Sequence, residues 1–260
     1  MKASMELVDR CSTLLWTAER ERAPIAVLTN EIPALDQATA YAIQWATFDR
    51  RGTPLAGFKL GGTVRAAPGV DRRSYGCLAA SGRLGESGAP ADPSRFMKPG
   101  IEAEIALRLG RDLAGAGHTR ESVAAHLDAV IPALEIADTR YTAFPSSLVD
   151  NIADNSSGGG FVLGEPVAWT AGTDLREVDV LFHEGDSLLG RGRGDEVMGD
   201  PLLALAWLAG RLAEDGRVLP AGAVVLTGGL VSSMAGIAGR SFRAVYTGFG
   251  ELSVAFAPMP

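Results

Sequence analysis

The sequence of 260 residues has little cysteine and little histidine, with two of the former and three of the latter. Cys11 and Cys77 are too few and too far apart to form a disulfide framework, and neither lies at metal-ligand spacing. This composition fits a reduced, cytoplasmic setting. His118, His126 and His183 have no other residues of metal-ligand type near them at binding spacing, so we expect them to lie at the surface.

The chain also lacks a run of basic residues and a long apolar run. Its formal net charge of −7 argues against nucleic acid or an anionic membrane as a partner. The apolar stretch at residues 202–209 is too short to span a bilayer. Lys2 is followed by Glu6 and Asp9 before any apolar run develops, which makes a poor signal peptide. With 47% hydrophobic residues, the sequence predicts a soluble protein with a buried core.

The chain does contain a strand-like stretch at residues 100–109 that carries two carboxylates. Apolar residues alternate along it, so Glu102 and Glu104 point to the same face. A second strand-like stretch, residues 131–138, places Glu135 on the face opposite to its apolar neighbours. If the two strands are neighbours, three carboxylates converge, and they repel one another unless a cation holds them.

Carboxylate oxygens suit Mg²⁺, Mn²⁺ or Ca²⁺, whereas zinc usually takes nitrogen or sulfur ligands. The alternative is that these glutamates lie on a solvated strand face and bind nothing. The spacing alone leaves both interpretations open.

Several motifs, in order along most of the chain, carry a resemblance to a known family. They are Gly57-Phe58-Lys59-Leu60-Gly61, Ile101-Glu102-Ala103-Glu104-Ile105-Ala106-Leu107, Pro132-Ala133-Leu134-Glu135-Ile136-Ala137-Asp138-Thr139-Arg140, Asp154-Asn155-Ser156-Ser157, Phe161-Val162-Leu163-Gly164, Trp207-Leu208-Ala209 and Val225-Leu226-Thr227-Gly228-Gly229-Leu230. With these motifs the sequence resembles the 2-oxopent-4-enoate hydratase and 4-oxalocrotonate decarboxylase family.

The resemblance implies an α+β fold, a mixed β-sheet roll of the fumarylacetoacetate hydrolase type. We accordingly expect residues 1–53 to form an N-terminal helical region and residues 54–260 to form the catalytic domain. Residues 64–99 lack sustained periodicity and are expected to form a long loop or lid, and residues 150–160 to form a polar turn. Apolar periodicity predicts helices at residues 5–22, 35–51, 119–129 and 200–214.

The same resemblance implies a site. Glu102, Glu104 and Glu135 would bind Mg²⁺ or Mn²⁺, and Lys59 would be the catalytic lysine, although a solvated lysine at a strand end is the simpler interpretation. The residues expected to bind substrate are Ser156, Ser157, Thr227 and Gly228. Beside this site we expect a structural ion pair between Asp138 and Arg140.

The implied function is a divalent-metal-dependent lyase of the hydratase type in aromatic catabolism. Its substrate would be a short unsaturated 2-oxo or 2-hydroxydienoic acid, with an enolate stabilised by the metal and protons moved by Lys59. The family's habit also implies a homo-oligomer.

The sequence departs from the family after Tyr75-Gly76. Where relatives usually carry one or two acidic residues, this chain has Ala80 and Ser81, and Glu86 is the nearest acid. Hydration needs a group that positions and deprotonates water, so this change makes decarboxylation or tautomerisation of a vinylogous 2-oxo acid the alternative.

Two further functions are alternatives to lyase chemistry. Hydrolysis of an acylpyruvate is disfavoured, because the enzymes of that kind resemble one another in having a histidine upstream of the glutamate strand, and here none precedes His118. A non-catalytic binding protein on the same fold remains open because the predicted lid is altered.

Overall fold

A computed structural model of the chain describes residues 4–64, 71–233 and 237–258. Its α-helices are α1 (Met5–Glu21), α2 (Gln37–Arg50), α3 (Arg120–Ala124), α4 (Leu148–Ala153) and α5 (Pro201–Glu214). Its strands are β1 (Leu55–Gly61), β2 (Ser74–Ala79), β3 (Pro90–Ala91), β4 (Gly100–Leu109), β5 (Leu127–Ala137), β6 (Gly158–Leu163), β7 (Val167–Ala168), β8 (Asp179–Glu184), β9 (Ser187–Arg193), β10 (Val224–Leu226), β11 (Val231–Ser233), β12 (Ser241–Tyr246) and β13 (Gly250–Phe256).

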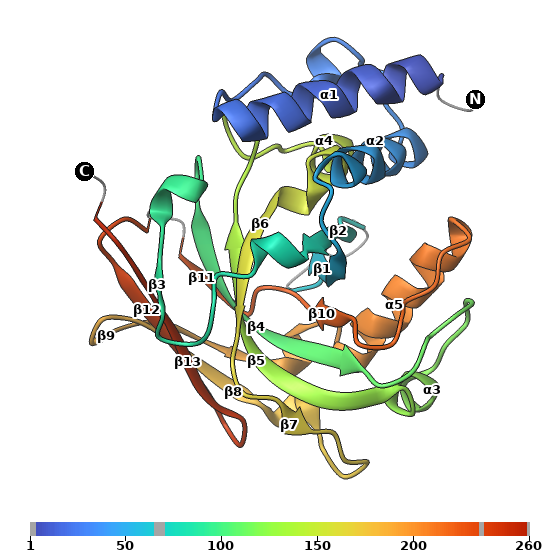
Figure 1. Cartoon of the computed structure of the whole chain (residues 1–260). Coiled ribbons are helices and arrows are strands. Elements are labelled where there is room, and N and C mark those ends of the chain that lie inside the picture. The colour runs from blue at the N-terminus through green and yellow to red at the C-terminus, as the bar shows by residue number, and fades with distance from the viewer. Residues whose placement is uncertain (1–3, 65–70, 234–236, 259–260) are drawn as a thin grey trace.

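The three long helices begin at the capping residues that the sequence contains. Ser4, Asp36 and Asp200 precede α1, α2 and α5, and each side chain accepts a hydrogen bond from a backbone N–H of the first turn. The helices predicted at residues 5–22, 35–51 and 200–214 are therefore confirmed to within about two residues. Figure 1 shows α1 and α2 together at one end of the molecule, and α2 contacts α4 there.

Two sheets form the body of the protein. The eight-stranded sheet has the order β2-β1-β10-β4-β5-β6, with β11 added to β4 and β7 added to β5, and β1 pairs with β10 in parallel. This sheet curls, because the segment after β2 bridges back to β6 through Arg83 and Phe161. The second sheet has the order β3-β13-β12-β8-β9. The fold is thus α+β with mixed sheets and helices before the first strand, as expected (Figure 1).

The two faces of β4 point into different parts of the core. Ile101, Ile105 and Leu107 belong to the large apolar cluster that also contains residues of the second sheet. Ala106 lies on the other face, in a smaller cluster with Ile131 and residues of β6 and β10. The glutamates share the face of Ala106, so they point toward the inside of the curl.

The loop or lid predicted at residues 64–99 was wrong where the chain forms β2 and the short strand β3. All six residues of β2 are buried, and β2 pairs with β1 in the large sheet. A strand buried on both faces has no alternation of polar and apolar residues, which explains why periodicity did not reveal it. Residues 65–70 of this segment lie outside the described residues.

Two other local predictions need correction. The helix predicted at residues 119–129 ends at Ala124, and from Leu127 the chain is already in β5. The prediction extended the helix too far because a short apolar run is compatible with a helix or a strand. Residues 150–160 are not a simple turn: they contain most of α4, a short 3₁₀ segment and the start of β6. The division at residues 53 and 54 stays a prediction.

Candidate active site

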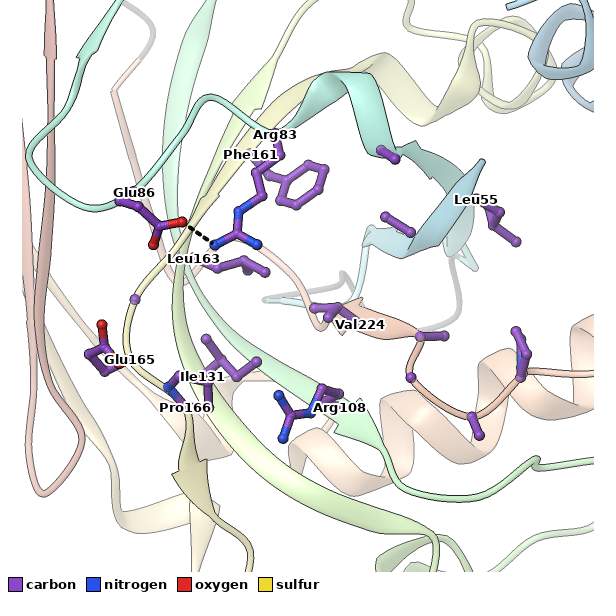
Figure 2. A pocket seen from close by; sticks show the side chains of 17 residues that line it. Leu55, Arg83, Glu86, Arg108, Ile131, Phe161, Leu163, Glu165, Pro166 and Val224 are labelled. Carbon is purple, nitrogen blue, oxygen red and sulfur yellow. Dashed lines mark hydrogen bonds and ion pairs between the residues drawn. The ribbon is translucent and has the colours of Figure 1, made fainter. Parts of the chain in front are cut away.

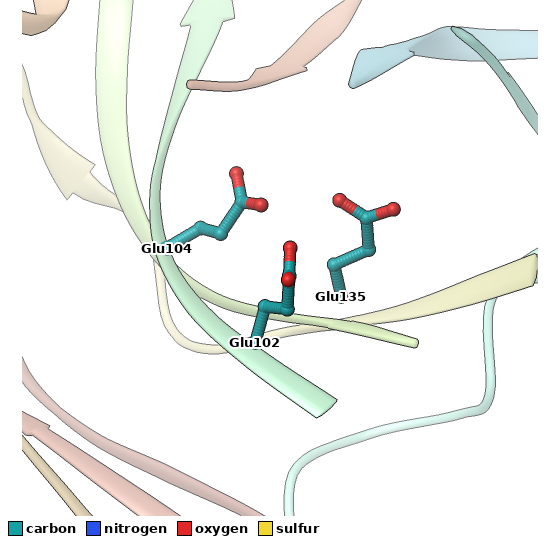
Figure 3. Close-up of side chains that lie close together, drawn as sticks. All are labelled: Glu102, Glu104 and Glu135. Carbon is teal, nitrogen blue, oxygen red and sulfur yellow. The ribbon is translucent and has the colours of Figure 1, made fainter. Parts of the chain in front are cut away.

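Three glutamates converge inside the curled sheet. Glu102 on β4 is the register partner of Glu135 on β5, and Glu104 pairs with Ala133 two residues along. One carboxylate oxygen from each glutamate lies within 4.8 Å of the others. Figure 3 shows the three side chains projecting to the same side of the two strands. The predicted convergence is therefore confirmed, and the antiparallel register of β4 and β5 produces it.

Burial makes this cluster electrostatically costly. Glu104 and Glu135 are fully buried, and Glu102 is partly exposed. Burial, followed by the charge of Glu135, raises the pKa of Glu102 to about 7. The same two causes, with the charge of Glu102 added, raise the pKa of Glu104 well above its ordinary range. Ionised together, the three groups need a positive charge among them.

The unsatisfied oxygens of the cluster fit a hard cation. Glu104 Oε2 accepts a hydrogen bond of 2.7 Å from the Gly228 N–H. Among the described residues, Glu104 Oε1 and Glu135 Oε2 are buried without a polar partner, and Glu135 Oε1 has only the Lys59 ammonium, at 2.9 Å. Buried oxygens normally have partners, and an oxygen-only ligand set is the kind that Mg²⁺, Mn²⁺ and Ca²⁺ take. These residues therefore fit such an ion.

Lys59 is the positive charge that the fold itself places here. Its side chain is buried, and Nζ lies 2.9 Å from Glu135 Oε1 and donates a 2.7 Å hydrogen bond to the Ser156 carbonyl. Burial lowers the pKa of Lys59. The nearby carboxylates, Glu135 first, together raise it by more than burial lowers it, so the net shift of the pKa is upward. The interpretation of Lys59 as a solvated residue is wrong, and the lysine holds a proton at the site.

A glycine makes room for this lysine. Gly76 on β2 is the register partner of Lys59. A Cβ at Gly76 would lie 2.2 Å from the Asn155 carbonyl oxygen and 3.2 Å from Lys59 Cδ. Any other residue at this position would displace the lysine or the chain segment that holds it.

That segment has an unusual backbone. Asn155, Ser156 and Ser157 all have positive φ angles, of 56°, 51° and 54°. The Asn155 side chain supports this conformation, because its Oδ1 accepts from the Cys77 N–H at 2.7 Å and its Nδ2 donates to the Cys77 carbonyl at 3.0 Å. Three successive left-handed residues are strained, and they turn the Ser156 carbonyl toward Lys59.

Asn155 was not predicted as a site residue. The only signal in the sequence was that asparagine tolerates the left-handed region better than most residues, and that property alone is common in turns.

The four residues predicted to bind substrate are buried around the cluster, and each already has a protein partner. Ser156 Oγ lies 2.6 Å from Ser74 Oγ, and Ser157 Oγ donates to Asn151 Oδ1 at 2.8 Å. Thr227 Oγ1 donates to the Ile105 carbonyl at 2.8 Å. The Gly228 N–H is the group that donates to Glu104. Their role in binding substrate stays a prediction.

The structural ion pair near the site has a different partner from the one predicted. Arg140 pairs with Asp154, and both are buried. Asp138 instead accepts hydrogen bonds from the backbone N–H groups of Met97 and Lys98, just before β4. Arg140 also donates to the carbonyl of Asp154, so the pair anchors the start of the left-handed segment.

A cavity of about 570 Å³ lies on the same inner face but apart from the carboxylates. Figure 2 shows its apolar lining, including Phe161 and Leu163, with Arg83 and Arg108 among the lining side chains. None of the three glutamates lines it, nor does Lys59. The cavity and the carboxylate cluster are therefore separate features of this inner face.

The altered segment borders the same cavity. Ala80 and Ser81 are exposed, in a short 3₁₀ turn (Ala80–Gly82), and Ala80 lines the cavity. Glu86 is also exposed and forms an ion pair of 3.1 Å with Arg83. A carboxylate at residue 80 or 81 would thus stand beside the cavity, which in this chain is lined by the carboxylates of Glu86 and Glu165.

Comparison with known proteins places this arrangement in a family. No protein-family model matches the chain. It is 36% identical over 258 residues to 2-keto-4-pentenoate hydratase 2 of Dechloromonas aromatica (strain RCB), covering 96% of this chain and 97% of that protein. It is also 36% identical over 245 residues to a 4-oxalocrotonate decarboxylase of Pseudomonas putida, covering 92% of each.

Solved structures agree with the sequence comparison. The 4-oxalocrotonate decarboxylase from Pseudomonas putida G7, complexed with magnesium and adipate, superposes with a TM-score of 0.92 and 33% identity over 98% of this chain and 99% of that one. The fumarylpyruvate hydrolase from Pseudomonas aeruginosa, at 16% identity and a TM-score of 0.63, shares the fold alone. The chain therefore belongs to the 2-keto-4-pentenoate hydratase and 4-oxalocrotonate decarboxylase family of lyases and has their fumarylacetoacetate hydrolase-like fold.

Proposed function

We propose that the protein is a divalent-metal-dependent hydratase of a short unsaturated 2-oxo or 2-hydroxydienoic acid. The observation that carries this proposal is the convergence of Glu102, Glu104 and Glu135 within 4.8 Å, with Lys59 Nζ 2.9 Å from one of them. Relatives named as 2-keto-4-pentenoate hydratases support the choice of reaction.

Mg²⁺ or Mn²⁺ is the cofactor we propose, held by the three glutamates. A bound divalent cation supplies Lewis-acid polarisation of a 2-oxo group, which favours enolate chemistry. The related decarboxylase structure that holds magnesium and adipate supports both the ion and a small carboxylate as ligand. Gly228 holds one oxygen of Glu104 through its N–H, which leaves the other oxygen of that carboxylate free.

Lys59 is the acid and base in this proposal. Its raised pKa keeps a proton on Nζ at neutral pH, and the hydrogen bond to the Ser156 carbonyl fixes that ammonium group beside Glu135. As the acid it donates a proton to the carbon chain of the substrate, and as the amine it accepts one in the reverse step. The left-handed segment therefore positions the proton that the reaction moves.

Decarboxylation is the second candidate, and one observation favours it. Residues 80 and 81, which are alanine and serine here, provide no carboxylate to activate water. Of the two glutamates that line the cavity, Glu86 is paired with Arg83 and Glu165 follows β6 on another segment. Decarboxylation needs an electron sink and a later proton donor but no positioned water. Tautomerisation has the same requirement. The remaining alternative is a binding protein without catalytic activity. Whichever of these functions holds, we propose that the protein assembles as a homo-oligomer.

The test is to supply the purified protein with Mg²⁺ or Mn²⁺ and two substrates in parallel. Ultraviolet absorbance and product NMR would follow 2-hydroxypenta-2,4-dienoate and 4-oxalocrotonate. Hydrated product from the first supports the hydratase, and carbon dioxide from the second supports the decarboxylase. Metal binding with turnover of neither substrate would contradict both.

A further inference from the structure

A tyrosine from the second sheet reaches the two strands that carry the glutamates. Tyr246 lies on β12 and is only 2% exposed. Its hydroxyl accepts a hydrogen bond of 3.1 Å from the Glu104 N–H and donates one of 2.7 Å to the Ala133 carbonyl. Glu104 and Ala133 are register partners on β4 and β5, so one side chain bridges the main chains of both strands.

The position of this bridge follows from the hydrogen-bond pattern of β4. The carbonyls of Ala103 and Ile105 accept from Leu230 and Thr227, on the side of β4 away from β5. Main-chain groups alternate in direction along a strand, so those of Glu104 face β5. In an unbroken antiparallel ladder they would pair with Ala133. The Tyr246 hydroxyl thus contacts the donor and the acceptor that an unbroken ladder between β4 and β5 would join at this point.

This bridge lies next to two of the three carboxylates. Glu104 is itself one of them, and Glu135 is two residues from Ala133 on the same strand face. In a buried setting both hydrogen bonds of the hydroxyl are strong, and leaving either main-chain partner without one is unfavourable. The spacing between the Glu104 and Glu135 backbones therefore depends on Tyr246.

We propose that Tyr246 is a positioning residue that sets the spacing of the Glu104 and Glu135 carboxylates and so gives the site its preference for a small cation. The inference rests on the proposed metal site. Mg²⁺ requires nearly ideal octahedral geometry at about 2.0–2.1 Å, whereas Ca²⁺ accepts about 2.3–2.6 Å with flexible coordination. A small shift of one strand against the other therefore weakens Mg²⁺ binding more than Ca²⁺ binding.

The test compares both ions in Tyr246→Phe, which removes the hydroxyl and keeps the ring. We expect calorimetry to show a loss of about tenfold or more in Mg²⁺ affinity and of less than about threefold in Ca²⁺ affinity. The matched control is Tyr141→Phe, which removes another buried hydroxyl that donates to a main-chain carbonyl, that of Asp150. The control should lower the melting temperature and leave the ratio of the two affinities unchanged.

Three results would overturn the inference. Unchanged affinities in Tyr246→Phe would show that the hydroxyl does not position the ligands, and an equal loss for both ions would show a general structural effect only. Wild-type protein that binds neither ion would overturn the proposed metal site as well, which separates that failure from the first two. If Tyr246→Phe does not fold, Tyr246→Met, which also lacks the hydroxyl, is judged by the same ratio.

Discussion

Glu102 on β4 and Glu135 on β5 are register partners, so two carboxylates lie opposite each other on one face of the sheet. Like charges in this position destabilise a strand pair, and Glu104 adds a third carboxylate nearby. Lys59 supplies one positive charge against three negative ones. Ionisation of all three carboxylates would therefore leave an excess of buried negative charge, which a divalent cation would offset.

Removal of one carboxylate should separate metal binding from folding. Glu104→Gln is expected to lower Mg²⁺ affinity by about a hundredfold, because an anionic ligand is lost. At alkaline pH, where the carboxylates ionise, the same change should raise the melting temperature of the metal-free protein, because repulsion between buried charges falls. Calorimetry and thermal unfolding with and without Mg²⁺ measure the two effects. Glu31→Gln, at an exposed position, is the control. Unchanged Mg²⁺ binding when all three glutamates are replaced would refute the metal site.

Lys59 should contribute to chemistry more than to metal binding. Lys59→Met keeps the length of the side chain and removes the proton, so kcat is expected to fall by about 10² to 10⁴. Mg²⁺ affinity should stay the same or rise, since a neighbouring positive charge is gone. Steady-state kinetics and calorimetry at saturating Mg²⁺ test both points, with the exposed Lys98→Met as control. Native turnover by Lys59→Met would show that another group moves the proton.

The stability of the protein should depend on pH in opposite ways with and without metal. The pKa of Glu102 is about 7 in the folded protein against an ordinary value of 4.5, and that of Glu104 is also raised. Between these values the folded state binds more protons than the unfolded state, so the metal-free protein loses stability as pH rises from about 4.5 to 7. Mg²⁺ binds the ionised carboxylates, so its affinity should increase over the same range.

Thermal unfolding between about pH 5 and pH 8 measures this divergence. The increase in melting temperature caused by Mg²⁺ should grow with pH through about pH 7, around which Glu102 ionises. Glu102→Gln should flatten the pH dependence of the metal-free protein. An Mg²⁺ effect that is the same at both ends of the range would contradict the raised pKa values.

The choice between hydration and decarboxylation should respond to the exposed 3₁₀ turn. Ser81→Asp introduces an acid next to Ala80, which lines the cavity, and the exposed position makes the cost in stability small, within about 0.5 kcal/mol. We expect the ratio of hydrated product to carbon dioxide to increase severalfold. Product NMR with both substrates measures that ratio. Ala114→Asp, an exposed site after β4, introduces the same charge elsewhere and should leave the ratio unchanged. An unaltered ratio in Ser81→Asp would remove residue 81 from the explanation.

Much of the fold was predictable because its signals are local. Capping residues and apolar spacing located the long helices, and alternation along residues 100–109 put Glu102 and Glu104 on one face. The family resemblance then supplied the neighbouring strand that brings Glu135 to them. None of these inferences required a contact to be known in advance.

Tertiary structure decided the rest. The strand β2 has no alternation because both its faces are buried, so its sequence resembles a loop. The partner of Arg140 turned out to be Asp154 because the fold brings the 3₁₀ segment against the end of β5, and the nearer Asp138 is taken by backbone N–H groups.

The chain by itself therefore determined which residues carry charge and which face of a strand they occupy, because these follow from side-chain chemistry and the two-residue period of β structure. Only the folded protein determined that Lys59 meets the Ser156 carbonyl and that Tyr246 meets Glu104. Those contacts join residues that lie 97 and 142 positions apart. They depend on strand register and on the packing of one sheet against the other, which no local pattern encodes.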